Sequence, residues 1–420
     1  MTTATDLAEK VHTLVLKGFT HEFGKPAKAA SPDAEWQKVV AAGTTLWLDT
    51  GDIDEASKLI TAEFEALTTN NTLLNKEIQK GQYDDFVVEV AKELREAAPG
   101  ISDQELMLEI GFVLNATHGL KLVEQFDTKV SVELHTDLSH DVDLSVSYGL
   151  RYFAICPERF IVKVPLTAAG LLAARKLRLA NVPINFTLGF SARQNHVAAL
   201  LTQPNWVNVF MGRLNAFVSD NDLGPGDNVG EKATLACQRN LLDLRASGRS
   251  NSHLIGASMR TGDQVATLAG LDVFTMPTGV ASGYRENPVA SLSNQVQNDP
   301  EVPLNDGVSF DDFNAGTLWD IPADFRAVTD ALLEKDLDAL TPAGLQEHFA
   351  DGGFPGFLPQ WTDEEIATVT KEGKIPVYAT WKDRLVSGEL GLDALMNISA
   401  LHSFVTDQTA LDDRVRGLIG

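Results

Sequence analysis

The chain has 420 residues, of which 44% are hydrophobic and 22% are charged, a composition typical of a soluble globular protein with room for one large core and extensions. Its formal net charge of -24 disfavours nucleic acid and anionic membrane surfaces as partners. Cys156 and Cys237 are too few for a disulfide framework and lack metal-site spacing, and the first residues show neither a signal peptide nor a membrane span, so we expect a cytoplasmic protein.

Residues 1–43 predict a helical extension that precedes the main fold. Leu7 and Val11 recur on one helical face, as in an amphipathic helix packed on a core. From Thr44 to Pro277, short apolar runs alternate with helical patterns. The interval between the second and third apolar runs is longer and predicts an insert of further helices.

The apolar runs between Thr44 and Pro277 lead to polar residues, and most are followed by a signal for the start of a helix. Strands that alternate with helices predict βα units and a parallel sheet. If the sheet closes into an eight-stranded barrel, these polar residues meet at one rim, where such barrels place their active sites. The polar residues are Asp49, Glu133, Asn185, Thr187, Arg213, Ser258 and Arg260.

The run Arg159–Pro165 differs from the others because it carries Lys163 inside an otherwise apolar strand. A buried cation is costly unless it is paired, and desolvation lowers the pKa of a lysine. A neutral amine in a shielded pocket can attack a carbonyl and form a Schiff base. The pattern is also compatible with a structural lysine that closes a buried ion pair, so this segment alone leaves both interpretations open.

The residues after the last apolar run predict a loop and then further helices. Ser282–Phe313 has little periodicity and is rich in Asn, Asp, Ser and Pro, which predicts a long surface loop. Helical patterns resume with start signals at Thr341-Pro342 and Thr362-x-x-Glu365. A loop over the barrel rim, or a lid, is predicted for Ser219–Gly230, which contains three aspartates and three glycines.

These elements predict an α/β fold, a (β/α)8 TIM barrel with an N-terminal helical preface and a long, mainly helical C-terminal extension. The predicted divisions are an N-terminal helical extension (1–43), the barrel (44–277), and a C-terminal loop and helical extension that packs on the barrel (278–420).

Seven motifs occur in order between Thr44 and Pro277, and together they resemble the successive motifs of the transaldolases. They are Leu48-Asp49-Thr50-Gly51-Asp52, Leu67-Thr68-Thr69-Asn70-Asn71-Thr72-Leu73, Val132-Glu133, Val162-Lys163-Val164-Pro165-Leu166-Thr167, Asn185-Phe186-Thr187-Leu188 with Phe190-Ser191, Phe210-Met211-Gly212-Arg213, and Gly256-Ala257-Ser258-Met259-Arg260. Seven blocks in family order form a far more specific match than any single block.

The resemblance implies a transferase of the pentose phosphate pathway. It would move a dihydroxyacetone unit from a ketose phosphate, such as sedoheptulose 7-phosphate or fructose 6-phosphate, to an aldose phosphate through a lysine Schiff base. It implies no cofactor and no metal, sugar phosphates as substrates, and a monomer or homodimer. The family also has a C-terminal helical segment near the barrel mouth.

The resemblance also implies roles for individual residues. Lys163 would form the imine, and Asp49 would move the C4 hydroxyl proton. Glu133, through a water held by Thr187, would serve imine formation. The implied substrate-binding residues are Asn70, Asn185, Asn208, Phe210, Arg213, Ser258 and Arg260, of which the serine and the two arginines would hold the phosphate.

Each of these residues also has a structural alternative. Either carboxylate could merely pair with Lys163, and Asn70 could satisfy a turn through its side chain. Arg213 and Arg260 could be surface ion-pair partners. Because the residues occur together and in this order, they favour catalytic and substrate-binding roles over purely structural ones.

Some positions depart from the family pattern. Asn71 stands where members usually have proline, and Asn208-Val209 stands where they have serine-proline. His135–Asp137 occupies a stretch where an arginine is common. These changes affect the expected donor or acceptor sugar. Phe210 stands where the stand-alone fructose-6-phosphate aldolases carry tyrosine, and a ring without a hydroxyl favours transfer over free aldol cleavage.

The sequence is also compatible with other functions. A fructose-6-phosphate aldolase or a variant sugar-phosphate aldolase would use much of the same machinery. A metal-dependent aldolase could draw ligands from His135, Asp137, His140 and Asp141. A non-catalytic barrel that binds sugar phosphates would have no need of Lys163 together with two carboxylates.

Overall fold

Eight short parallel strands close into a barrel in the order in which they occur along the chain. The computed structural model describes residues 4–27 and 29–420, so residues 1–3 and Lys28 of the predicted N-terminal extension lie outside the described residues. The first strand pairs with the second and with the eighth, which closes the barrel and confirms the predicted (β/α)8 fold. The strands are β1 (Thr45–Asp49), β2 (Phe64–Thr68), β3 (Lys129–Glu133), β4 (Phe160–Pro165), β5 (Ile184–Thr187), β6 (Trp206–Phe210), β7 (His253–Ala257) and β8 (Val273–Pro277).

The strand side chains alternate between the barrel interior and the surrounding helices. Trp47 belongs to a small apolar cluster inside the barrel, whereas Leu46 and Leu48 belong to the main core, which also contains residues of the surrounding helices. The rings of Trp47 and Trp206 meet inside the barrel with their centroids 5.0 Å apart. Because alternate side chains share a face, Asp49 points to the same interior as Trp47. The polar residues at the carboxyl ends of the strands therefore lie at one end of the small apolar cluster that fills the barrel.

Helices join successive strands on the outside of the barrel. Three of them form the predicted insert between β2 and β3, namely α4 (Asn71–Gln79), α5 (Asp84–Ala97) and α6 (Asp103–Phe126). The remaining connections are α3 (Ile53–Leu59), η1 (Thr136–Leu138), α7 (Val142–Ile155), α8 (Ala168–Leu179), α9 (Ala192–Thr202), α10 (Met211–Asp220), α11 (Val229–Ala246) and α12 (Asp263–Thr267), with α13 (Thr278–Glu286) after the last strand.

Helix α6 is the one helix of the described residues that is long and apolar enough to cross a membrane by length and composition. Within the fold, 89% of its most apolar window is buried. Packing in the core therefore accounts for the apolar character of this helix.

The structure corrects two predicted loops. Helix α13 extends into the predicted loop Ser282–Phe313, because Tyr284 packs on Trp36 with ring centroids 5.1 Å apart and continues the helical face of Val280. The loop predicted at the rim, Ser219–Gly230, is shorter than expected, because its first residues belong to α10 and its last residues belong to α11. Its middle bonds to the segment near residue 305 through the Leu223 carbonyl, and it does not line the cavity described below.

The C-terminal extension is helical, with both predicted start signals in place. Thr341 caps α16 with proline at the first helical position, and Thr362 and Glu365 form a capping box at α17. The elements are η2 (Phe310–Phe313), α14 (Gly316–Trp319), α15 (Ala323–Leu333), α16 (Pro342–Asp351), α17 (Asp363–Glu372), α18 (Tyr378–Val386) and α19 (Leu392–Ile419).

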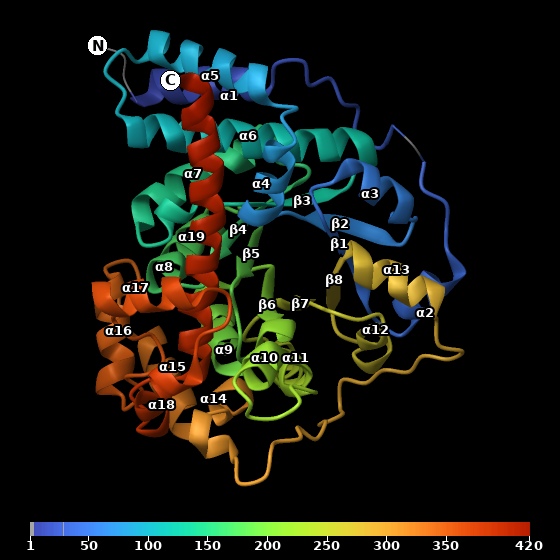
Figure 1. Cartoon of the computed structure of the whole chain (residues 1–420), viewed down its shortest axis with the longest axis vertical. Coiled ribbons are helices and arrows are strands. Elements are labelled where there is room, and N and C mark those ends of the chain that lie inside the picture. Colours follow the sequence, from blue (N-terminus) through green and yellow to red (C-terminus); the bar gives the residue numbers. More distant parts are fainter. Residues whose placement is uncertain (1–3, 28) are drawn as a thin grey trace.

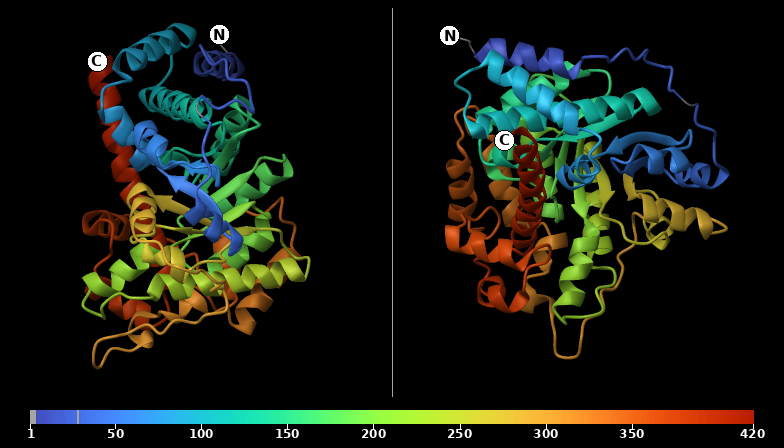
Figure 2. Two further views of the ribbon diagram at one scale, coloured as in Figure 1. Left: turned by 90° about the vertical axis from the view of Figure 1, so that its right-hand side faces the viewer. Right: turned by 45° about the horizontal axis from the view of Figure 1, so that its top comes forward.

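Helix α19 runs across the carboxyl ends of β4 and β5, and Figures 1 and 2 show it as one long red helix. Asn397 Nδ2 donates to the carbonyls of Leu166 (3.0 Å) and Leu188 (2.7 Å), which follow those two strands. Further along the helix, Asp407 accepts a hydrogen bond from Thr72 on α4. The helix is thus fastened to the rim at several points.

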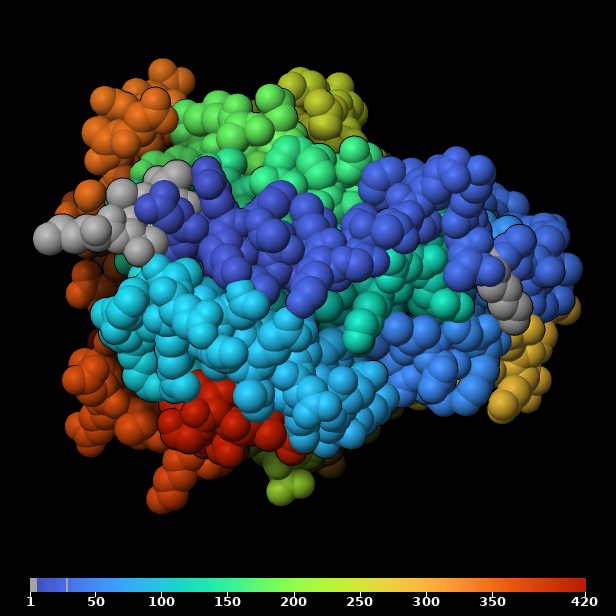
Figure 3. Space-filling model, turned by 90° about the horizontal axis from the view of Figure 1, so that it is seen from above, coloured from blue at the N-terminus to red at the C-terminus, as the bar shows by residue number. Residues whose placement is uncertain are grey.

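The two ends of the described chain lie on the same face of the molecule. Helix α1 (Ala4–Val15) packs against α5 and α6, and α2 (Ala34–Ala41) leads into β1. Arg414 of α19 pairs with Asp84 of α5 at 2.7 Å. Figure 3 shows blue α1, cyan α5 and the red end of α19 together on this face.

Candidate active site

A cavity of about 170 Å³ opens at the carboxyl ends of the strands, far larger than the space of a single bound water. All the predicted site residues except Glu133 and Thr187 line it. The lining residues are Asp49, Thr68, Asn70, Thr72, Leu73, Lys163, Asn185, Asn208, Phe210, Arg213, Ile255, Ala257, Ser258, Arg260, Thr275, Pro277, Lys374 and Phe404. The cavity therefore occupies the place where TIM barrels carry out chemistry.

Lys163 stands in β4 between two strands that carry polar interior residues. Its register partners are Glu133 on β3 and Asn185 on β5. Lys163 Nζ lies 3.2 Å from Glu133 Oε2 and donates to the Thr69 carbonyl at 2.9 Å. Only 4% of the Lys163 surface is exposed. The lysine therefore closes a buried ion pair and also borders the cavity, an arrangement that is compatible with both interpretations of its position.

Asp49 ends β1 and takes part in a chain of hydroxyl contacts. Thr68 Oγ1 donates to Asp49 Oδ1 at 2.6 Å and lies 2.6 Å from Thr275 Oγ1. Burial raises the pKa of Asp49, and the charge of Lys163 opposes part of this shift. A carboxyl group whose pKa is raised toward neutrality can exchange a proton with a bound molecule more readily.

Glu133 lies behind Lys163, and Thr187 ends the β5 strand. Burial also raises the pKa of Glu133, against the attraction of Lys163. Thr187 Oγ1 and Asn185 Oδ1 are buried, and neither has a hydrogen-bond partner among the described residues. Buried polar atoms without protein partners are the usual places for an ordered water.

Arg213 and Arg260 bring two positive charges to the same cavity as Ser258. Within the described part of the chain neither guanidinium forms an ion pair, so the surface ion-pair alternative is wrong. Burial lowers the pKa of Arg213 to about 10, with a contribution from Arg260. Burial likewise lowers the pKa of Arg260, and Asp49 opposes this. A buried Arg213 and a more exposed Arg260, neither with an ion-pair partner among the described residues, favour an anionic ligand.

The remaining predicted residues border the cavity while also bonding to the backbone. Asn70 Oδ1 caps α4 by accepting from Leu73 N at 2.8 Å, so its structural alternative holds in part. Asn208 Oδ1 accepts from Gly189 N at 3.0 Å. Phe210 packs edge-on against Phe190, with centroids 5.8 Å apart.

The acidic and histidine residues after β3 do not form a metal cluster. His135 Nδ1 accepts from the Asp137 amide at 3.2 Å, and its Nε2 lies 3.6 Å from Asp412 of α19. Among the described residues, no group of three or more His, Cys, Asp or Glu side chains could hold a metal ion. The four residues considered for a metal-dependent aldolase are therefore not assembled for that purpose.

Nine of the eighteen lining residues were missed by sequence reasoning, among them Thr68, Thr275, Lys374 and Phe404. Thr68 and Thr275 end or nearly end their strands on the interior side, and the same strand-end pattern that marked Asp49 could have found them. Lys374 and Phe404 come from the C-terminal extension. No local signal marks them, since only long-range packing brings them to the barrel.

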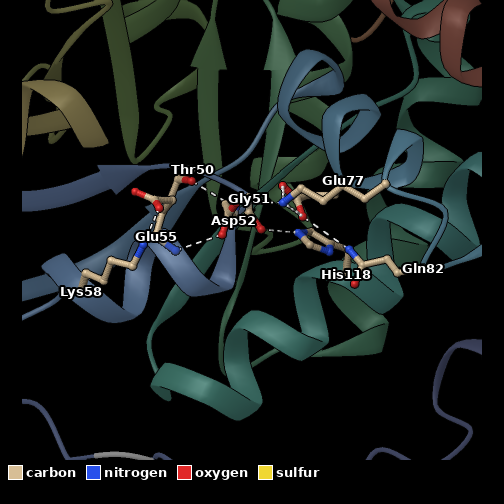
Figure 4. Close-up of polar contacts among 9 residues, drawn as sticks. Thr50, Gly51, Asp52, Glu55, Lys58, Glu77, Gln82 and His118 are labelled. Atoms are coloured by element: carbon tan, nitrogen blue, oxygen red, sulfur yellow. Dashed lines mark hydrogen bonds and ion pairs between the residues drawn. The ribbon is translucent and has the colours of Figure 1, made fainter.

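The loop that follows Asp49 is held from behind by a buried histidine, as Figure 4 shows. The Gly51 carbonyl accepts from His118 Nε2 at 2.8 Å, so His118 Nδ1 accepts from the Tyr83 hydroxyl at 2.8 Å. Lys80 adds an ion pair to Asp52 at 2.8 Å and another to Glu77. This network fixes the backbone immediately after Asp49.

The buried histidine predicts a dependence of stability on pH. Burial lowers the pKa of His118 to about 4, whereas the unfolded chain has the ordinary value of 6.5. Between these values the unfolded state binds the proton and the folded state does not, so stability falls as pH falls. We expect His118 to cost about 2 kcal/mol in the free energy of unfolding between pH 7.5 and pH 5.

Urea unfolding at the two pH values checks this expectation, with His118→Gln as the comparison, because glutamine can still donate to the Gly51 carbonyl. Other groups contribute to the wild-type slope, among them His196, whose pKa burial also lowers to about 4. The difference between the two proteins in the pH dependence of the free energy of unfolding gives the contribution of His118. Identical slopes in the two proteins would show that His118 is not kept neutral by the fold.

Comparison with known proteins agrees with this geometry. A family model described as Transaldolase/Fructose-6-phosphate aldolase matches residues 46–339. A probable transaldolase of Dictyostelium discoideum is 25% identical over 284 residues, which cover 66% of this chain and 87% of that protein. A transaldolase of Xanthomonas campestris pv. campestris is 28% identical over 236 residues, with 54% and 71% covered. One of Protochlamydia amoebophila is 26% identical over 276 residues, with 63% and 83% covered. The chain therefore belongs to the transaldolase/fructose-6-phosphate aldolase family of enzymes.

Proposed function

We propose that this enzyme is a transaldolase that moves a three-carbon ketone unit between sugar phosphates through a Schiff base on Lys163. One observation carries the proposal. Lys163 lies beside the buried carboxyl group of Glu133 and borders a cavity that it shares with Asp49 and with two arginines that have no ion-pair partner among the described residues. An amine, proton carriers and anion-binding groups in one cavity are the parts that this reaction needs.

The first stage would form the imine. Lys163 Nζ adds to the ketose carbonyl carbon C2, a water molecule leaves, and a positively charged iminium remains. Glu133, 3.2 Å from Nζ, would carry protons during this addition and dehydration. The unpartnered Thr187 hydroxyl is suited to hold the water that would relay them.

The second stage would break the carbon–carbon bond. Asp49 takes the proton of the C4 hydroxyl, and the C3–C4 electron pair moves into the iminium. The aldose phosphate leaves, and a three-carbon enamine stays on Lys163. Transfer to an acceptor aldehyde reverses these steps and returns the proton from Asp49.

The numbers of carbon atoms in the substrates and products determine which sugars the test assay must use. A six-carbon ketose phosphate that gives up three carbons leaves glyceraldehyde 3-phosphate, and a four-carbon aldose phosphate that gains them becomes a seven-carbon ketose phosphate. We expect the protein to convert fructose 6-phosphate and erythrose 4-phosphate into sedoheptulose 7-phosphate and glyceraldehyde 3-phosphate in the presence of EDTA. Activity that EDTA removes and a divalent metal restores would favour a metal-dependent aldolase.

Phe210 distinguishes transfer from simple aldol cleavage. Its ring borders the cavity and approaches Phe404 with centroids 6.5 Å apart, so this wall offers no hydroxyl to a water beside the enamine. We expect Phe210→Tyr to raise the release of free dihydroxyacetone relative to transfer. The measurement is the ratio of dihydroxyacetone to sedoheptulose 7-phosphate formed, with Phe190→Tyr as the neighbouring control. A wild-type protein that already releases dihydroxyacetone as fast as it transfers it would make the aldolase alternative the better one.

A further inference from the structure

Part of the cavity wall comes from outside the segment that matches the family. Lys374 lies in the turn between α17 and α18, and Phe404 lies on α19. Both follow residue 339, where the family match ends. The C-terminal extension of this chain therefore reaches the same cavity as Lys163.

The turn that carries Lys374 is held in place from three sides. Ser399 Oγ on α19 donates to the Gly373 carbonyl at 3.0 Å. Asn221, at the end of α10, donates to the Pro376 carbonyl at 3.0 Å. Arg213 Nη1 lies 3.4 Å from the Lys374 carbonyl, which it bonds weakly. The position of Lys374 is thus coupled directly to one of the two arginines of the cavity.

The positive charges at this end of the cavity are only partly compensated, by Asp407 near Arg213 and by Asp49 near Arg260. Lys374 forms no ion pair within the described ranges, and neither does Arg213 or Arg260. The pKa of Arg213 is lowered by burial and then by Arg260, which shows that the positive charges repel one another. Such an arrangement in a chain of net charge -24 is stabilised when a multiply charged anion enters.

We propose that Lys374 is a substrate-binding residue that adds a third cation to the phosphate site formed by Arg213 and Arg260. This inference rests on the proposed function and names a determinant of its specificity. A lysine ammonium is a compact charge on a flexible stem, so it can follow the phosphate group of sugars of different length. The extension therefore raises the preference of the enzyme for phosphorylated over unphosphorylated sugars.

The test compares three variants with the wild type. Lys374→Gln removes the charge, Lys374→Arg keeps it, and Lys371→Gln removes an exposed charge from the end of α17 as the matched control. Steady-state transfer gives kcat and KM for fructose 6-phosphate and erythrose 4-phosphate. Borohydride trapping with unphosphorylated dihydroxyacetone measures imine formation without a phosphate. Thermal unfolding with and without inorganic phosphate measures anion binding independently of activity.

We expect Lys374→Gln to raise KM for the phosphorylated sugars about 10- to 100-fold, the range for a lost hydrogen bond to a charged group. Trapping with dihydroxyacetone stays within about twofold of the wild type, because the change spares the amine and the carboxyl groups. The stabilisation by inorganic phosphate shrinks. Lys374→Arg keeps most of the affinity, and Lys371→Gln behaves as the wild type.

Unchanged KM values and unchanged phosphate stabilisation in Lys374→Gln would overturn the inference. So would an equal loss for phosphorylated sugars and for dihydroxyacetone, which would show that Lys374 only supports the turn. Absence of both transfer and trapping in the wild type would instead refute the proposed function. In that case the phosphate stabilisation still decides whether Lys374 binds an anion at this site.

Discussion

Replacement of Lys163 should abolish the covalent intermediate. Lys163→Arg keeps a positive charge beside Glu133, so the buried carboxylate retains a partner and the fold is preserved. A guanidinium cannot form the imine, and we expect transfer to fall on the order of 10⁶-fold, the scale of losing a covalent nucleophile. Lys163→Met removes the charge as well, leaves Glu133 buried and unpaired, and should lower the unfolding temperature.

The measurement is borohydride reduction in the presence of fructose 6-phosphate, followed by peptide mass analysis. In the wild type, the peptide that contains Lys163 should gain a three-carbon adduct. Lys76, an exposed lysine on α4, provides the matched control, since Lys76→Arg should leave both trapping and transfer intact. An adduct on a different lysine, or transfer that survives in Lys163→Arg, would remove the basis of the proposed mechanism.

Replacement of Asp49 should separate imine formation from bond cleavage. Asp49→Asn keeps an oxygen that can accept from Thr68 but cannot take the C4 hydroxyl proton. The ketose should still form an imine on Lys163, and cleavage should slow by about 10²–10⁴-fold, the usual contribution of a positioned acid–base group. Borohydride should then trap the intact six-carbon sugar on the protein in place of the three-carbon fragment.

Glu133→Gln is the contrasting variant. It removes the charge next to Lys163 but leaves Asp49 unchanged. We therefore expect slower imine formation, whereas cleavage and transfer proceed at the wild-type rate once the imine has formed. Single-turnover trapping as a function of time distinguishes the two variants. If Asp49→Asn accumulates the three-carbon adduct at the wild-type rate, a different group performs the cleavage and Asp49 has an electrostatic role.

The barrel and the strand-end residues of the candidate site could be predicted because both depend on local patterns. Each apolar run of a parallel sheet is short and bounded, so a polar residue at its end marks the rim. Asp49, Glu133 and Thr187 each end a strand in the structure, and Lys163 lies two residues before the end of β4. The period of two along a strand then places Asp49 on the interior face together with Trp47.

The rest of the site could not be predicted for a physical reason. Lys374 lies 161 residues after Arg213 in the chain, and the bonds of Asn221, Ser399 and Arg213 hold its turn at the barrel. The many apolar residues of α19 indicate that the helix is packed but do not show which surface it covers. The predicted start of the long loop was wrong because Ser282 and Gly283, which are typical of loops, precede the buried Tyr284 that belongs to α13.

The attachment of α19 has a consequence for the biosynthesis of the enzyme. A ribosome makes the chain from its N-terminus, and domains generally fold in that direction during synthesis. All eight strands, Lys163 and both arginines are made before Asn397 can bond to the carbonyls of Leu166 and Leu188. A barrel that folds during synthesis therefore has Lys163 at an open rim, and the cavity gains the wall formed by Lys374 and Phe404 only near the end of translation. The order of synthesis therefore means that the cavity is completed only when the chain is nearly complete.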